Sequence, residues 1–262
     1  MASQSSRGQF VWHELLAKDT KAEQAFYKQV VGWSTKKWEG PGSADVDYTM
    51  WMAGDRPIGG VMGLPADAKE AGAPPNWTAY VEVPDADETT RQATSLGGTV
   101  LMGPHSAEGV GRFTIMKDPQ GAVFAFITSA TPPEPETDPR ALDFSWHELA
   151  TTDYKAAAKF YKTLFGWEKK AEHDMGDMGV YYMFGRGRFT YGGMYDKPKD
   201  MPAPPHWVHY VQVDNADAAA DRAKKAGGRV VNGPMEVPGG DRIAVILDPE
   251  GASFAVHSKA KA

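Results

Sequence analysis

The chain has 262 residues, a formal net charge of −6 and 42% hydrophobic residues, a composition typical of a folded globular protein. It contains no apolar run long enough to span a membrane and no basic stripe to meet phosphates, so we expect neither membrane nor nucleic acid as a partner. Cysteine is absent, which excludes disulfides, thiolate metal sites and a cysteine nucleophile, and favours a cytoplasmic location.

The first predicted elements are a strand, a helix and three strands. The strand covers residues 11–16. The helix has Thr20 as its predicted N-cap and Glu23 three residues later, the spacing of a capping box, and Gly32 ends it. The strand-like stretches that follow are 33–38, 47–52 and 58–62, with a hairpin turn at 54–57.

The same order of elements then repeats. A strand at residues 77–83 precedes a helix that Asp85 can cap and that Gly97-Gly98 ends. Three more strands are predicted at 99–102, 113–117 and 123–128. The first half of the chain therefore consists of two strand–helix–three-strand units, written βαβββ.

This whole pattern is duplicated along the chain. Trp12-His13-Glu14-Leu15 returns as Trp146-His147-Glu148-Leu149, and later motifs recur in the same order. We predict one domain at residues 9–129, a proline-rich and acidic linker at 130–142, and a second domain at 143–259.

Three motifs in order carry a family resemblance. They are Asp19 with Phe26-Tyr27, then Gly32-Trp33, and finally Asp118-Pro119-Gln120-Gly121. The second copy has Asp153, Phe160-Tyr161, Gly166-Trp167 and Asp248-Pro249-Glu250-Gly251. With them nearly the whole chain resembles the glyoxalase/bleomycin-resistance/extradiol-dioxygenase superfamily, also called vicinal oxygen chelate proteins. The resemblance implies an α+β fold in which each domain's two βαβββ units form a curved sheet around a ligand cleft, with helices outside.

Many members of this family bind a divalent metal in that cleft. Alignment to the family places the expected ligands at Trp12, Gly60, Thr78 and Ala125 in the first copy, and at Trp146, Gly193, Val208 and Ala255 in the second. A catalytic metal site needs about three protein ligands, and only Thr78 offers even a weak oxygen donor. We therefore predict no metal and no other cofactor.

The repeated His-Glu pair is not a metal motif on a regular strand. Neighbouring strand residues point to opposite faces, so His13 and Glu14 cannot both reach one ion, and the same holds for His147 and Glu148. We expect both histidines to lie beneath helices with hydrogen-bond partners; the alternative is that they act as a base or a ligand.

The remaining residues of the predicted clefts suit a small organic ligand. Glu14 and Glu148 are candidate general bases, because a carboxylate beside a tryptophan is partly desolvated and its pKa rises. The candidate ligand-binding residues are Trp12, Tyr80, Glu82, Trp146, Tyr210, Gln212 and His257. The alternative is a filled cleft, with the glutamates paired to an arginine such as Arg112 or Arg242.

We therefore predict metal-independent binding of a small, aromatic or amphipathic molecule. One alternative is an enzyme of the same superfamily, a lyase, isomerase or dioxygenase, with a non-standard metal set or a glutamate base. Another is a structural or interaction protein with filled clefts. The chain is expected to be a monomer that resembles a fused dimer, or a homodimer, and the four βαβββ units could close within each copy or across the copies.

Overall fold

Each copy folds as two βαβββ units, as the sequence predicts. The structure is a computed structural model that describes residues 6–41, 43, 46–70 and 72–260. The helices are α1 (Thr20–Val30), α2 (Ala66–Glu70), α3 (Ala86–Ser95), α4 (Tyr154–Phe165) and α5 (Ala216–Lys225), with a short 3-10 turn, η1 (Gly176–Met178). None of the helices formed by these described residues is long and apolar enough to cross a membrane.

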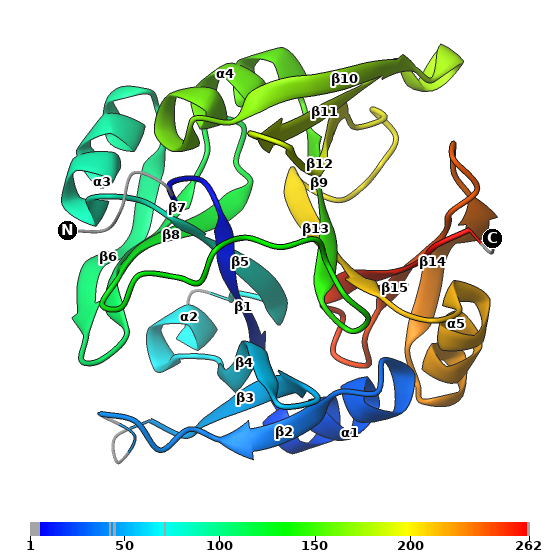
Figure 1. Cartoon of the computed structure of the whole chain (residues 1–262), viewed down its shortest axis with the longest axis horizontal. Helices are drawn as coiled ribbons and strands as arrows, with labels where there is room; N and C mark the ends of the chain where they lie inside the picture. Colours follow the sequence, from blue (N-terminus) through cyan, green and yellow to red (C-terminus); the bar gives the residue numbers. More distant parts are fainter. Residues whose placement is uncertain (1–5, 42, 44–45, 71, 261–262) are drawn as a thin grey trace. The chain divides into compact units, whose positions relative to one another are not determined.

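The strands of the two copies correspond one to one (Figure 1). The first copy has β1 (Phe10–Ala17), β2 (Ser34–Lys37), β3 (Tyr48–Ala53), β4 (Arg56–Gly63), β5 (Asn76–Glu82), β6 (Thr99–Ala107), β7 (Gly111–Lys117) and β8 (Val123–Ser129). The second copy has β9 (Phe144–Thr151), β10 (Glu168–Asp174), β11 (Val180–Arg186), β12 (Phe189–Asp196), β13 (His206–Gln212), β14 (Arg229–Glu236), β15 (Arg242–Leu247) and β16 (Ser253–Ser258).

These strands form one eight-stranded sheet per copy. The strand order is β2-β3-β4-β1-β5-β8-β7-β6 in the first and β10-β11-β12-β9-β13-β16-β15-β14 in the second. Within each βαβββ unit the first and last strands run parallel, as β1 and β4 do, and the other pairs are antiparallel. The predicted α+β fold with two βαβββ units per copy is confirmed.

The start of α1 differs from the prediction. Asp19, not Thr20, is the N-cap, and its carboxylate accepts hydrogen bonds from the backbone N–H groups of Lys21 and Ala22. Glu23 is therefore one position too far along to close a capping box. Its side chain is instead fully buried. Asp85 does cap α3, as predicted, by accepting from the Glu88 N–H.

The chain divides into two compact units that each combine halves of both copies. The first unit contains residues 6–12, 78–138 and 146–207, and the second contains most of 13–77 together with 139–145 and 208–260. In the second unit α1 packs against α5, and in the first α3 packs against α4. Each sheet is therefore formed by the strands of one copy, whereas each of the two large hydrophobic cores contains residues of both copies.

The repeated motifs meet in these cores. In the second unit the Trp77 indole N–H donates to the Tyr27 hydroxyl (2.7 Å), which donates to the Asp248 carboxylate (3.0 Å). In the first unit Trp207, Tyr161 and Asp118 form the same chain, at 3.2 and 3.0 Å. Because a buried polar group is costly without a partner, each tyrosine from one copy is tied to an aspartate from the other. The shared motifs therefore hold the two copies together inside each unit.

Candidate functional site

The best-defined polar cluster lies in the first unit, on the first half of the second copy. Trp146 and Glu148 stand two residues apart on β9, and Tyr181 comes from β11. The Trp146 indole N–H donates to the Tyr181 hydroxyl (2.8 Å), which in turn donates to Glu148 Oε2 (2.8 Å). We call these three residues the Trp146 cluster. The structure thus brings together two predicted site residues and adds a tyrosine that sequence reasoning missed.

Tyr181 is held over a glycine. Gly193 of β12 is in register with Glu148, and a Cβ atom at Gly193 would come within 2.1 Å of the Tyr181 ring. Gly60 and Tyr48 repeat this contact in the first copy, again at 2.1 Å. Only glycine lets the aromatic ring approach the strand so closely. The recurrence of Tyr and Gly at the same spacing in both copies is the signal that could have found Tyr48 and Tyr181.

Burial keeps the Tyr181 hydroxyl protonated at neutral pH. Desolvation raises the pKa of Tyr181 well above its usual value, and the negative charge of Glu148 raises it further. The pKa of Tyr195, which stacks on Tyr181, is raised for the same two reasons. Tyr181 therefore remains a hydrogen-bond donor at neutral pH, directed at a carboxylate.

The first half of the first copy has a related arrangement in the second unit. Glu14 is in register with Gly60, as Glu148 is with Gly193, and both glutamates are half-buried. Trp12 belongs to the other unit, where it packs against Tyr80 and Ala125.

The second half of the first copy, in the first unit, presents an apolar surface. Tyr80, Ala125 and Ile127 form a buried cluster, with Phe113 against Tyr80. Glu82 is fully buried beside it and accepts hydrogen bonds from the backbone N–H and the hydroxyl of Ser129. Burial raises the pKa of Glu82 in spite of these bonds. These contacts place Tyr80 in an apolar cluster and hold Glu82 in a structural network.

The second half of the second copy, in the second unit, is polar at the corresponding place. Gln212 of β13 and His257 of β16 are in register, as are Tyr210 and Ala255. The His257 ring lies within hydrogen-bond distance of Ser145 and Asp241. Ser145 and Asp241 were not predicted. Ser145 lies 112 positions from His257 in the sequence and Asp241 lies 16 positions from it, and neither spacing is a recognisable motif.

The histidines next to the repeated glutamates are buried and stacked on aromatic rings. His13 stacks on Phe144 in the second unit, and His147 stacks on Phe10 in the first. Desolvation lowers the pKa of His13 well below its usual value and that of the buried His209 to about 3. Both rings are therefore neutral at pH 7.

Arg112 and Arg242 do not pair with glutamates of the predicted clefts. Arg112 forms a two-pronged ion pair with Asp87, and Arg242 forms one with Asp217. Each aspartate lies in the first turn of a helix, Asp87 in α3 and Asp217 in α5. The ion pair therefore anchors that helix to the strand that carries the arginine. The predicted alternative of an Arg–Glu pair is wrong for these two arginines.

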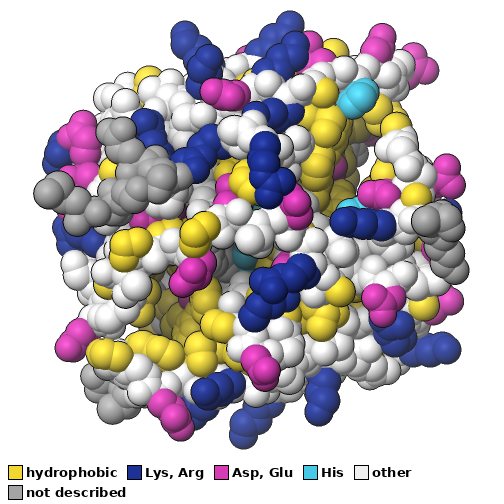
Figure 2. Space-filling view, in the orientation of Figure 1, with side chains coloured by type: hydrophobic (Ala, Val, Ile, Leu, Met, Phe, Trp, Pro, Cys, Tyr) yellow, Lys and Arg dark blue, Asp and Glu magenta, His cyan; other side chains and the backbone are white. Residues whose placement is uncertain are grey.

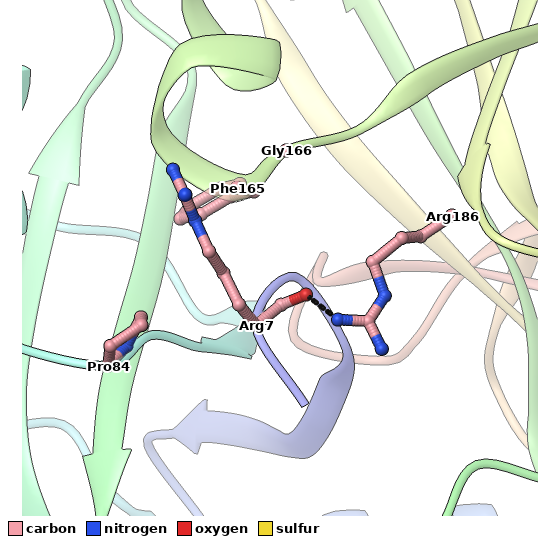
Figure 3. Close-up of a pocket in the computed structure, with 5 residues that line it drawn as sticks. All are labelled: Arg7, Pro84, Phe165, Gly166 and Arg186. Atoms are coloured by element: carbon pink, nitrogen blue, oxygen red, sulfur yellow. Dashed lines mark hydrogen bonds between the residues drawn. The ribbon is translucent and has the colours of Figure 1, made fainter. Parts of the chain in front are cut away.

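A hollow of about 220 Å³ lies in the first unit, lined by Arg7, Pro84, Phe165, Gly166 and Arg186 (Figure 3). The Arg7 guanidinium donates to the carbonyls of Thr163 and Leu164 at the end of α4, and Arg186 donates to the Arg7 carbonyl. None of the predicted site residues lines this hollow. In the view of Figure 2, side chains of Lys and Arg are interspersed with those of Asp and Glu rather than gathered into a basic stripe.

The residues at the eight aligned metal positions do not fit a metal ion. The two glycines lie under tyrosine rings, so that no side chain can reach inward from them. Val208, Ala125 and Ala255 are buried and have no donor atom. A tryptophan indole offers only a donor, and one threonine oxygen cannot hold a cation alone.

The fold defines a class of protein, a tandem chain of paired βαβββ units. Residues 144–256 match the model of the Glyoxalase/Bleomycin resistance protein/Dioxygenase superfamily, and residues 11–127 match that of the Glyoxalase-like domain. The chain belongs to this superfamily.

Two similar relatives span almost the whole chain. "Putative glyoxylase CFP32" of Mycobacterium tuberculosis is 30% identical over 246 residues, which cover 94% of this chain and 92% of the relative. "Anthracycline biosynthesis protein DnrV" of Streptomyces peucetius is 30% identical over 256 residues, covering 94% and 91%.

Solved structures share the fold at low identity. The Mn(II)-bound glyoxalase from Novosphingobium aromaticivorans has a TM-score of 0.60 and 15% identity, covering 98% of this chain and 83% of its own. The 2,2',3-trihydroxybiphenyl 1,2-dioxygenase from Sphingomonas wittichii has a TM-score of 0.64 and 12% identity, covering 98% and 92%. At this identity the likeness concerns the fold alone.

Proposed function

We propose that the chain binds a small aromatic or amphipathic molecule at the Trp146 cluster without using a metal. The observation that carries the proposal is the hydrogen-bond chain from Trp146 through Tyr181 to Glu148. It joins a flat apolar side chain to a fixed, half-buried carboxylate. Such a combination recognises a ligand with an aromatic body and a hydrogen-bond donor.

An ionised carboxylate accepts at about four positions, and one donor to Glu148 is the Tyr181 hydroxyl, at Oε2. The names of relatives support an aromatic ligand, since two of them are called anthracycline biosynthesis proteins and anthracyclines are polycyclic aromatic compounds. The ligand-binding roles of Tyr210, Gln212 and His257 belong to the same proposal.

Metal independence rests on the donor set. The aligned ligand positions hold two tryptophans, two glycines, two alanines, a valine and a threonine, which together lack the chemistry for a divalent ion. Elemental analysis of the purified protein should find no stoichiometric divalent metal. A stoichiometric ion that disappears on Glu14→Gln or Glu148→Gln substitution would overturn this part of the proposal.

Binding is tested by calorimetry with a panel of planar aromatic compounds that includes a hydroxyanthraquinone and 7-hydroxycoumarin, each of which carries a hydrogen-bond donor. Tyr181→Phe and Glu148→Gln should each weaken binding about tenfold or more, because a hydrogen bond to a charged group contributes about 1.5–3 kcal/mol. Tyr182→Phe is the matched control, since Tyr182 is the next residue on β11 and lies near Tyr154 instead. Equal affinities for all four proteins would argue against the site.

A second candidate function is catalysis with Glu148 as a general base. It is favoured by the same Tyr181 bond, which fixes the carboxylate for proton abstraction. Chemical conversion of a bound compound, lost in Glu148→Gln with affinity retained, would separate an enzyme from a binding protein. The filled-cleft alternative is supported by the apolar cluster around Tyr80, and predicts no binding by any panel member.

The proposal includes a monomeric, cytoplasmic chain. Each compact unit already takes half of its elements from each copy, as a dimer of single-domain chains would across its interface. Light scattering should give the mass of one chain, 28.5 kDa.

A further inference from the structure

A second hydrogen-bonded chain of reactive side chains lies in the second unit. Ser145 Oγ is 3.0 Å from His257 Nδ1, and His257 Nε2 is 2.7 Å from Asp241 Oδ2. Ser145 is the second residue of β9, His257 lies near the end of β16, and Asp241 precedes β15. Both distances are within the range of good hydrogen bonds between such groups. We call these residues the Ser145 relay.

The Asp241 carboxylate determines which ring nitrogen of His257 carries the proton. Asp241 can only accept when ionised, so the His257 proton lies on Nε2 and Nδ1 is the acceptor. Ser145 then donates its hydroxyl proton to Nδ1, and its lone pairs remain available to accept from a ligand. Asp241 Oδ1 itself accepts a hydrogen bond from the Ala260 N–H at 2.8 Å. A hydroxyl, an imidazole and a carboxylate in this order can move a proton toward the imidazole.

The first copy shows that the fold does not require this relay. The equivalents of Ser145, Asp241 and His257 are Val11, Gly111 and Ile127, according to the repeated motifs around them. Val11 and Ile127 belong to the apolar cluster around Tyr80. Apolar side chains thus fill the positions equivalent to Ser145 and His257 in the first copy. Because the fold is built there without the polar residues, we assign Ser145, His257 and Asp241 a chemical role rather than a structural one.

The relay is reachable by solvent. The His257 side chain is 16% exposed and that of Asp241 36% exposed, and Ser145 is half-buried. Gln212 stands beside His257 in register, and Tyr210 precedes it by two residues on the same face of β13. Gln212 supplies an amide in register with His257, and the backbone carbonyl of Tyr210 lies 3.5 Å from Ser145 Oγ.

We propose that the Ser145 relay binds a weakly acidic hydroxyl group, a phenol or an enol, and accepts its proton. The ligand O–H bond breaks, its proton goes to Ser145 Oγ as the serine proton passes to His257 Nδ1, and the oxyanion remains beside the imidazolium–carboxylate pair. Ser145 contacts the ligand, and Asp241 is a positioning residue. The inference rests on the proposed small-molecule function and adds to it a second site, in the second unit, with its own ligand class.

The test uses 7-hydroxycoumarin, whose phenolate has its own absorption band, and 7-methoxycoumarin, which has no proton to lose. The full chain should bind both. At a pH below the dissociation of the free phenol it should raise the amount of phenolate about tenfold, since an opposite charge in contact favours the charged form. His257→Gln and Ser145→Ala should still bind 7-methoxycoumarin but lose the phenolate band. Lys259→Gln should keep the band.

Each outcome has one meaning. Binding of both compounds without extra phenolate, or with a band that survives His257→Gln, overturns the relay and leaves the proposed function standing. A band lost only in Lys259→Gln assigns the effect to the lysine charge and also overturns the relay. Failure of the wild-type chain to bind any panel compound overturns the proposed function itself. Circular dichroism on each variant checks that the fold is retained.

Discussion

Glu23 should make the protein less stable as the pH rises. This carboxyl is 0% exposed in the second unit, beside Asp248 and near Glu250. Burial raises its pKa to about 9, with the charges of Asp248 and Glu250 adding to the effect. The folded chain therefore keeps a proton on Glu23 at pH values where the unfolded chain releases it.

The sign and size follow from proton linkage. Between the unfolded value, 4.5, and about 9, the folded state binds more protons at this group, so stability falls with rising pH. Each pH unit in that window costs up to about 1.4 kcal/mol. From pH 5 to pH 8 the upper bound is about 4 kcal/mol, and because Asp248 shares the charge we expect about 2–3 kcal/mol.

Glu23→Gln tests this expectation, since an amide keeps the shape and supplies an N–H donor toward Asp248. Urea denaturation, followed by circular dichroism, should give Glu23→Gln and wild type similar stabilities at pH 5. At pH 8 the variant should be more stable by about 2–3 kcal/mol. Glu108→Gln, an exposed glutamate between β6 and β7, is the control and should change nothing.

Identical pH dependences of Glu23→Gln and wild type would refute the reasoning. The equivalent position in the first unit holds Ala157, which is fully buried, so the fold itself does not need an acid at this place. Glu23→Ala is therefore a second variant expected to fold, and it should also lose the pH-dependent difference.

The other predictions concern single contacts. Gly193→Ala places a Cβ atom against the Tyr181 ring and should weaken ligand binding about tenfold or more in calorimetry, whereas Gly63→Ala, with open space around it, should not. Tyr161→Phe removes the donor to the buried Asp118 and should lower the free energy of unfolding by about 1–3 kcal/mol in urea titrations. Arg112→Ala breaks a solvent-exposed pair and should cost less than about 1 kcal/mol by the same measurement.

Much of the fold could be predicted because its signals are local. Strand alternation, helix caps and glycine turns depend on neighbours within a few residues, and the duplication placed the same elements in both copies. The local signals failed where two residues could serve as the same cap: Asp19 took the role assigned to Thr20. With Asp19 as the N-cap, Glu23 lies one position beyond the capping-box site, and its side chain is buried instead.

Part of the candidate site could also be predicted. Alternation along β1 and β9 separated the repeated histidines from Glu14 and Glu148, and burial of His13 and His147 agrees with that separation. Tyr181 was missed because its role depends on a contact with Gly193 across a hairpin and with Glu148 of another strand. Neither contact leaves a periodic signal within one copy, and only the recurrence of Tyr and Gly at the same spacing in the two copies reflects the first of them.

The sequence by itself determined the duplicated βαβββ units and the superfamily. Only the tertiary structure decided that each hydrophobic core takes half its elements from each copy, and that Ser145 meets His257 and Asp241. The physical reason is distance along the chain. Secondary structure follows from neighbouring residues, whereas cores and reactive clusters are made by residues from tens to more than a hundred positions apart, whose meeting depends on how the whole chain packs.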